Sequence, residues 1–316
     1  FDRVRGPYLD WHTNSINQQA TNYNTLQRFL KHGQEVGEDV EVCRDQDQFT
    51  SFNWYVETTG SGTANEVGGI NTTRTLVDST AGISTGIFEG TASASTIGHG
   101  IGAVPKFIIL KGLDNSSYST VCYHYGVASD PETDYIQLNS TDDRADDVGM
   151  WNDTAPTSTV FSVGTGSSVN KSGETMAYYA FANIEGYSKF GSYEGNGSTS
   201  KAGPLIYTGF RPQLVIIKNV EANSTYWMVM SRDRADASPQ TPAGIDIQNP
   251  FQNYLQMNAT NADTGGYDTI DMLSTGFKVV NTTAWSSINT SGQRHIYMAW
   301  AEHPFGGEST TPVPAS

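Results

Sequence analysis

The chain of 316 residues carries 18 Lys and Arg against 33 Asp and Glu, a formal net charge of −15. Charged residues make up only 16% of it and hydrophobic residues 37%, while aromatic residues reach 11%. The acidic balance argues against nucleic-acid binding, because such a surface repels phosphates. No apolar run approaches the roughly 20 residues that span a bilayer, so we expect no membrane insertion.

The first segment, residues 1–60, is predicted to be a partial N-terminal β-module. One block of this segment recurs later in the chain: Leu30-Lys-His-Gly33 followed by Val36 is similar to Leu273-Ser-Thr-Gly276 followed by Val279. In addition, Phe52-Asn-Trp54 occupies the position of the aromatic closing strand of the later copies. The opening at Phe1 suggests a fragment or a processed form. A helical pattern is limited to Asn24–Lys31, where three apolar residues follow the spacing i, i+3, i+4.

Residues 61–82 are predicted to be a linker, in which Thr73–Asp78 forms an extended strand. Two complete β-sandwich modules then follow at residues 83–186 and 187–306. Residues 307–316 form a tail rich in Pro, Ser and Thr that we expect to fray.

The two modules are predicted from internal repetition, because four blocks recur in the same order. The first two recur at offsets of 105 and 107, and the last two at 119. The increase in offset from 107 to 119 predicts a 12-residue insertion in the second copy, within Arg232–Pro250. The paired blocks are Gly86–Ser93 with Gly191–Ser198, Pro105–Lys111 with Pro212–Lys218, Tyr135–Thr141 with Tyr254–Thr260, and Asn170–Ala182 with Asn289–Ala301.

Each copy has the pattern of an antiparallel β-sandwich. The Pro105–Lys111 and Pro212–Lys218 runs have uniformly apolar centres, Phe107–Leu110 and Leu214–Ile217, and predict strands buried on both faces. Asn-x-Ser-Gly, at Asn170 and again at Asn289, predicts a hairpin turn before the last strand of each copy. Six or seven short strands in each copy, separated by turn signals, complete the pattern.

Local motifs for catalysis are weak. Gly82-Ile-Ser84-Thr-Gly86 is a literal G-x-S-x-G, but strand-like residues follow it where a nucleophile elbow requires a helix. The six histidines show no zinc-type spacing, and His99 is expected in a tight turn with a structural role. Cys43 and Cys122 are interpreted as buried small hydrophobic residues rather than a disulfide.

The densest acidic cluster comprises Asp142, Asp143, Asp146 and Asp147. Four carboxylates within six residues suggest a calcium site, since Ca²⁺ takes oxygen ligands from flexible loops. A solvated loop without metal is the alternative, and we expect no other cofactor. Trp151 and Trp285 lie in polar contexts, which suggests either exposed rings for sugar binding or plugs over the end of a sandwich.

Several blocks resemble one known family. They are Gly195-Asn-Gly-Ser198 after an aromatic strand, Gly98-His-Gly-Ile-Gly102 with Pro105-Lys106 and Ile108-Ile109, Val160–Gly164, Glu185–Tyr193, Tyr207–Pro212 and the opening Phe1–Gly6. These blocks resemble the repeated β-domain of uncharacterised virion proteins of tailed phages, especially marine phages and cyanophages. The resemblance covers about Gly86–Phe305 well and Phe1–Gly60 less well.

The resemblance implies a virion structural protein, a tail fibre or surface appendage involved in host attachment, rather than an enzyme. It implies location at the virion surface, with partners that include other virion proteins, a host-surface receptor or glycan, and further copies of this chain in a homotrimer. The candidate receptor-binding residues are the four aspartates, Trp151 and Trp285. A capsid decoration or head-fibre protein and a polysaccharide-degrading tailspike are the alternatives.

Overall fold

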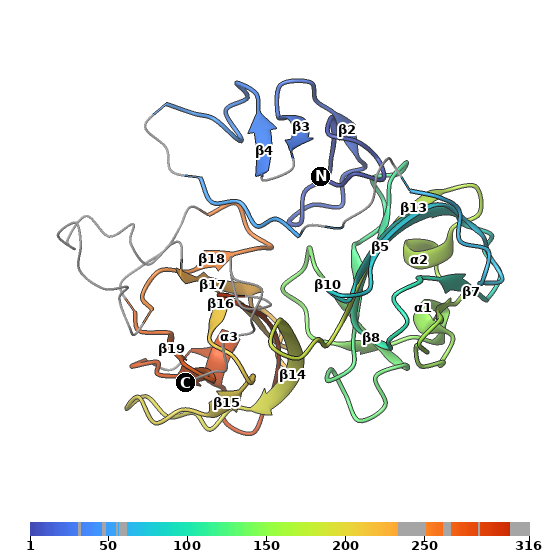
Figure 1. Ribbon diagram of the computed structural model, residues 1–316. Coiled ribbons are helices and arrows are strands. Elements are labelled where there is room, and N and C mark those ends of the chain that lie inside the picture. Colours follow the sequence, from blue (N-terminus) through green and yellow to red (C-terminus); the bar gives the residue numbers. More distant parts are fainter. Residues whose placement is uncertain are drawn as a thin grey trace. The chain divides into compact units, whose positions relative to one another are not determined.

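Antiparallel strands supply nearly all the regular structure in the computed structural model, which describes residues 1–30, 33–45, 49–54, 56, 62–232, 251–261, 267–283 and 285–303 (Figure 1). Helices in this part of the chain are limited to α1 (Val148–Trp151), α2 (Ser167–Asn170) and α3 (Ser286–Asn289), each of four residues. The all-β prediction is therefore confirmed. None of the described helices is long and apolar enough to be a membrane-crossing candidate.

The first complete copy forms the strands expected from its apolar runs. Its strands are β6 (Ile83–Glu89), β7 (Ser95–Gly98), β8 (Pro105–Gly112), β9 (Val121–His124), β10 (Asp134–Gln137), β11 (Ala145–Asp146), β12 (Val160–Val163) and β13 (Thr175–Ala182). A seven-stranded sheet has the order β11-β10-β9-β8-β13-β6-β5, and β12 pairs with β7. The linker strand β5 (Thr72–Asp78) confirms the extended strand predicted for Thr73–Asp78.

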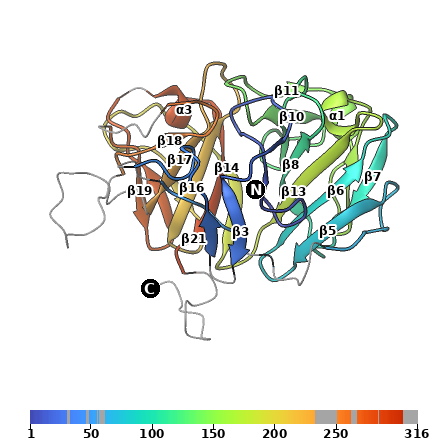
Figure 2. The same cartoon turned by 90° about the horizontal axis from the view of Figure 1, so that it is seen from above.

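The second copy repeats this arrangement. Its strands are β14 (Ser188–Glu194), β15 (Leu205–Tyr207), β16 (Pro212–Asn219), β17 (Met228–Ser231), β18 (Leu255–Gln256), β19 (Ile270–Leu273), β20 (Gly276–Val279) and β21 (Arg294–Ala301). They form sheets of order β14-β21-β16-β17-β18 and β15-β20-β19. Figure 2 shows β13, β6 and β5 as neighbouring ribbons in the first copy, and β14, β16 and β21 in the second.

Equivalent strands pair with equivalent partners, so the sequence repeat is also a structural repeat. The β13–β6 pair matches β21–β14, and the β12–β7 pair matches β20–β15. Each copy also places a glycine under a tyrosine ring: a Cβ on Gly86 would lie 2.6 Å from the Tyr178 ring, and a Cβ on Gly191 would lie 2.6 Å from the Tyr297 ring. The close approach requires glycine at both positions.

Burial explains the apolar runs of the long central strands. The neighbouring residues Phe107 and Ile108 of β8, and Ile216 and Ile217 of β16, are all buried, and because neighbours point to opposite faces both strands are covered on both faces. The second copy's core also contains Phe277, packed with its ring at an edge-to-face angle to Tyr297. Tight alternation of small and large residues along β13 and β21 accommodates these rings.

The Asn-x-Ser-Gly turns differ in part from the prediction. Gly173 and Gly292 do adopt positive φ, each at +72°, as such a turn needs. The turn follows a one-turn helix, however, and does not connect two hairpin strands. The buried Asn170 and Asn289 side chains hydrogen-bond to loops of their own copies: Asn170 accepts from Thr91 N and Asn289 from Asn196 N.

The amino-terminal segment forms two hairpins, β1 (Leu9–Asp10) with β2 (Ala20–Thr21) and β3 (Leu26–Leu30) with β4 (Gly33–Val36). The helix predicted at Asn24–Lys31 is therefore wrong. Pairing of β3 with β4 overrides a helical spacing of only three apolar residues. The pair Leu30↔Gly33 matches Leu273↔Gly276 in the second copy, so the recurring sequence block has the same strand pairing in both places.

Other predictions for the connecting segments have mixed outcomes. Phe52–Trp54 forms no strand in the described stretch 49–54, although Trp54 packs edge-on against Phe181 at 6.0 Å between ring centroids. Cys122 is buried as predicted, but Cys43 is exposed, and both are free thiols. Most of the predicted Arg232–Pro250 insertion and the 307–316 tail lie outside the described residues.

Contacts divide the chain into two compact units that do not follow the repeat boundaries. The first contains Phe1–Cys122 and Asp147–Phe181, and the second contains Tyr123–Asp146 and Ala182–Ser316. The hairpin β10–β11 belongs by sequence to the first copy, yet it is grouped with the strands of the second. Each unit thus combines a copy with a hairpin that precedes it in the chain.

Candidate functional site

The four predicted aspartates are not among the clusters of three or more metal-type side chains in the described residues. Asp147 caps the amino end of α1, with its Oδ1 accepting from Gly149 N at 2.8 Å, while Asp146 lies exposed in β11. Among the described residues, the group of His, Cys, Asp and Glu side chains whose ligand atoms lie within 4.8 Å of one another consists of Asp10, His12 and Glu41. The calcium hypothesis for the Asp142–Asp147 loop thus gains no geometric support.

The two tryptophans are positioned as packing residues. Trp151 is only 2% exposed, so of the two alternatives the exposed ring is wrong, and the burial agrees with a plugging role. The one-turn helix α1 turns this side chain inward. Trp285 is partly buried on the second copy's core, where its ring lies 4.6 Å from that of Tyr254.

The weak catalytic motifs have structural roles. Ser84 is fully buried within β6, and its hydroxyl lies 3.2 Å from Tyr178 Oη, so it is not on a nucleophile elbow. His99 accepts a hydrogen bond from Ile101 N and lies 3.2 Å from Thr157 O. Burial lowers the pKa of His99, which favours the neutral ring of a structural turn residue.

A lysine at the end of β16 forms a buried polar contact that the sequence motifs did not predict. Lys218 is fully buried, and its Nζ donates to Thr225 O at 2.7 Å, Thr225 Oγ1 at 2.8 Å and Thr141 O at 3.2 Å. Burial lowers the pKa of Lys218 to about 8, and the nearby Asp142 and Asp143 carboxylates act in the opposite direction. The ammonium group therefore holds the chain just before β11 against the second copy.

The equivalent lysine of the first copy, Lys111 at the end of β8, makes the matching contact. It too is fully buried, and its Nζ donates to Ile16 O at 3.1 Å and approaches Tyr118 O at 3.5 Å. Ile16 precedes β2 as Thr141 precedes β11. Burial again lowers the lysine pKa to about 8, with Glu174 acting in the opposite direction.

Backbone hydrogen bonds next to the two lysines also correspond between the copies. Gln19 N donates to Leu113 O at 3.0 Å, and Arg144 N donates to Val220 O at 3.0 Å. Gln19 directly precedes β2 and Arg144 directly precedes β11. Leu113 and Val220 each lie two residues beyond the buried lysine. We call this set of contacts, centred on Lys111 in one unit and Lys218 in the other, the hairpin-docking site.

The two docked hairpins have the same register. In the first, Leu9 pairs with Thr21 and Asp10 with Ala20; in the second, Asp134 pairs with Asp146 and Tyr135 with Ala145. Two further side chains bind the β10–β11 hairpin. Trp227 Nε1 donates to Gln137 O at 3.0 Å, and Asn258 Nδ2 donates to Ser140 O at 2.8 Å. A sequence signal for the site did exist: a lysine ends the apolar strand in both copies.

One strand edge differs between the copies. In the first, Ile70 forms a bridge to Ile97 of β7 and its N–H donates to Thr96 O, so the chain covers that edge. Among the described residues no strand or bridge covers the corresponding edge of β15. There Leu205 is 68% exposed and Tyr207 72% exposed.

Fold and contacts together define an all-β protein of tandem modules in which each copy binds the hairpin of the preceding segment. The chain belongs to the DUF7483 family, described as a domain of unknown function, which matches residues 1–304. No curated protein and no solved structure matches the chain.

Proposed function

We propose that this protein is a structural component of a tailed-phage particle, a tail fibre or similar surface appendage that takes part in host attachment. The motif resemblance supplies the phage context, and the hairpin-docking site supplies the physical support. A contact that occurs twice with the same donors and acceptors suits a chain assembled from repeated units, because each copy completes its hydrogen bonding with the segment before it.

The docking site carries this proposal because its chemistry is unsuited to catalysis or to ligand exchange. Both ammonium groups are fully buried and bonded to main-chain carbonyl oxygens of their own protein. Breaking such contacts leaves buried polar groups without partners, which is costly. Because these contacts are costly to break, they suit a stable mechanical connection between segments of the chain.

Self-association of the chain into a homotrimer is part of the proposal. The uncovered edge of β15 supports it, because exposed edge strands with large apolar side chains tend to pair with another chain. A second copy of this chain is the proposed occupant of that edge. Asp142, Asp143, Asp146, Asp147 and Trp285 remain candidates for contact with a host receptor or glycan, whereas the buried Trp151 does not.

Imaging of the phage particle tests the location. An antibody raised against this chain should label the tail appendages of intact particles in electron micrographs. Labelling of the capsid surface would favour the head-fibre alternative, and no labelling of intact particles would contradict the virion-surface proposal. Release of sugars from host polysaccharide by the purified chain would instead support a tailspike enzyme.

Light scattering coupled to size exclusion tests the assembly. The wild-type chain should have the mass of a trimer at micromolar concentration, and the double variant Leu205→Glu, Tyr207→Glu should be monomeric. The control Val148→Glu, which alters an exposed apolar residue elsewhere, should keep the wild-type mass. A wild-type monomer would count against the fibre proposal, and a trimeric double variant would exclude the β15 edge as the contact.

A further inference from the structure

A buried carboxylate with one oxygen that accepts no hydrogen bond lies on β1 of the first docked hairpin. Asp10 is 6% exposed, and its Oδ1 accepts no hydrogen bond in the structure. An ionised carboxylate in such a position is costly unless a cation balances it. The Phe1 ammonium group attracts this carboxylate, but Oδ1 still accepts no hydrogen bond, so the position can take a further cationic partner.

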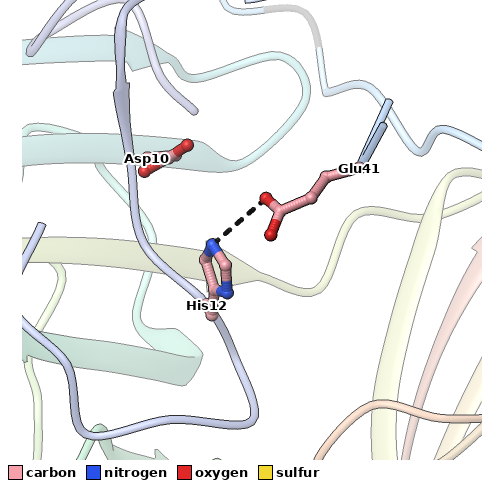
Figure 3. A group of neighbouring side chains, drawn as sticks. All are labelled: Asp10, His12 and Glu41. Carbon is pink, nitrogen blue, oxygen red and sulfur yellow. Dashed lines mark ion pairs between the residues drawn. The ribbon is translucent and has the colours of Figure 1, made fainter. Parts of the chain in front are cut away.

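Two further ligand side chains stand beside this carboxylate. His12 follows Asp10 by two residues, so that both side chains project from the same side of an extended chain. Figure 3 shows His12 pointing toward Glu41, and His12 Nε2 lies 3.6 Å from Glu41 Oε2. Ligand atoms of all three residues lie within 4.8 Å of one another.

The fold holds Glu41 in this place from a distant part of the sequence. The Asp39 carboxylate accepts from Glu41 N at 2.9 Å and from Asn22 Nδ2 at 2.9 Å. Asp39 N also donates to Asn24 O. These bonds tie the turn that carries Glu41 to the chain just after β2, and β2 pairs with the strand that carries Asp10.

The repeat shows that the fold itself does not require these ligands. Asp10 and His12 of the first docked hairpin correspond to Tyr135 and Gln137 of the second, as the matched registers establish. The second hairpin folds and docks without a carboxylate or an imidazole there. The ligand set is therefore particular to the amino-terminal segment.

We propose that Asp10, His12 and Glu41 bind a divalent transition-metal cation of the Zn²⁺ type. Tetrahedral Zn²⁺ with N and O ligands places neighbouring ligand atoms about 3.3 Å apart, close to the observed spacing of His12 and Glu41. An imidazole ligand favours Zn²⁺ over the hard cations Ca²⁺ and Mg²⁺. Two carboxylates balance the charge of the ion, and the exposed side next to His12 and Glu41 leaves room for water as the fourth ligand.

Bound metal would join the chain around β1 to the turn after β4, two segments separated by about thirty residues in the sequence. Calorimetric titration of the tag-free, chelator-treated full chain with Zn²⁺ tests the site. We expect one ion per chain. Asp10→Asn and His12→Gln should each weaken binding by more than about 100-fold, because the loss even of outer partners costs 10–100-fold.

Two control variants address adventitious binding. His303→Gln removes an exposed histidine elsewhere, and Cys43→Ser removes an exposed thiol near Glu41 in the sequence. Both should bind Zn²⁺ as the wild-type chain does. Binding that persists within threefold in Asp10→Asn and His12→Gln, or that is lost in Cys43→Ser alone, would overturn the assignment. Tighter binding of Ca²⁺ than of Zn²⁺ would overturn the cation class.

Hydrogen exchange separates loss of a ligand from loss of the fold. In the Asp10→Asn and His12→Gln variants the Gln19 amide, which bonds to Leu113 O, should keep its wild-type protection. Zn²⁺ should slow exchange of the Val42 and Cys43 amides in the wild-type chain but not in the variants. An unchanged rate for these amides in the wild-type chain at saturating Zn²⁺ would also contradict the proposal.

Discussion

Replacing Lys218 by methionine removes the charged group at the centre of one docking site while keeping an unbranched side chain of similar length. Thr141 O keeps a hydrogen bond from Thr225 N at 3.1 Å, and Thr225 Oγ1 keeps its bond to Ala222 O at 2.9 Å. The Thr225 carbonyl oxygen loses the 2.7 Å bond from the ammonium group. The substitution therefore removes the hydrogen bond to the buried Thr225 carbonyl oxygen and the contact with Thr141.

The magnitude follows from these partners. A buried acceptor left without a donor costs about 1–3 kcal/mol. Loss of the charge-assisted bond to Thr141 adds to this cost, and the removal of a buried charge offsets part of it. We expect a net destabilisation of about 2 kcal/mol for Lys218→Met.

Hydrogen exchange followed by mass spectrometry provides the assay. Exchange of the Arg144 amide, which donates to Val220 O, should accelerate by about 30-fold if local opening of the hairpin controls it. Peptides covering β6 and β13 of the first copy should be unaffected. Lys111→Met should show the reciprocal pattern, with faster exchange at Gln19 and no change at Arg144.

The partly exposed Lys189 on β14 provides the control, and Lys189→Met should leave both amides at wild-type rates. Two results would refute the reasoning. One is an unchanged Arg144 exchange rate in Lys218→Met. The other is an equal acceleration across both copies, which would mean that the lysine supports the whole fold rather than hairpin docking.

Three further substitutions test a close glycine contact, a buried hydrogen-bonded asparagine and a buried carboxylate. Gly191→Ala places a Cβ 2.5 Å from the Tyr297 hydroxyl oxygen, so we expect about 1–3 kcal/mol of destabilisation in urea unfolding; a change below about 0.5 kcal/mol would contradict the close packing. Asn289→Ala removes a buried side chain that accepts from Asn196 N and donates to Ser198 O, and it should cost about 2–4 kcal/mol with faster exchange at the Asn196 amide. Burial alone raises the pKa of Asp2, but Arg5 and the hydrogen bonds to the carboxylate together lower it. The folded-state pKa thus lies below the unfolded one, so the stability that Asp2 contributes is complete above about pH 4 and is lost as the pH falls further. The stability difference between wild type and Asp2→Asn should therefore be constant from pH 7 to 5 and shrink toward pH 3; a constant difference down to pH 3 would refute this.

Several local features followed directly from the order of residues. Apolar runs such as Phe107–Leu110 identified the central strands, because a strand buried on both faces has apolar residues at successive positions. Recurrence of four blocks in one order identified the two copies. The helix predicted at Asn24–Lys31 failed because three apolar residues in eight fit a short strand as well as a helix, and pairing with Gly33–Val36 decides between them.

Sequence alone determined the all-β class, the duplication and the central apolar strands, because these depend on the period and composition of short stretches. Only the tertiary structure decided where each hairpin docks, since the acceptors of Lys111 and Lys218 lie far from them in the sequence. It likewise buried Trp151 and gathered Asp10, His12 and Glu41. Such sites depend on distances between separate segments, and no local pattern encodes those distances.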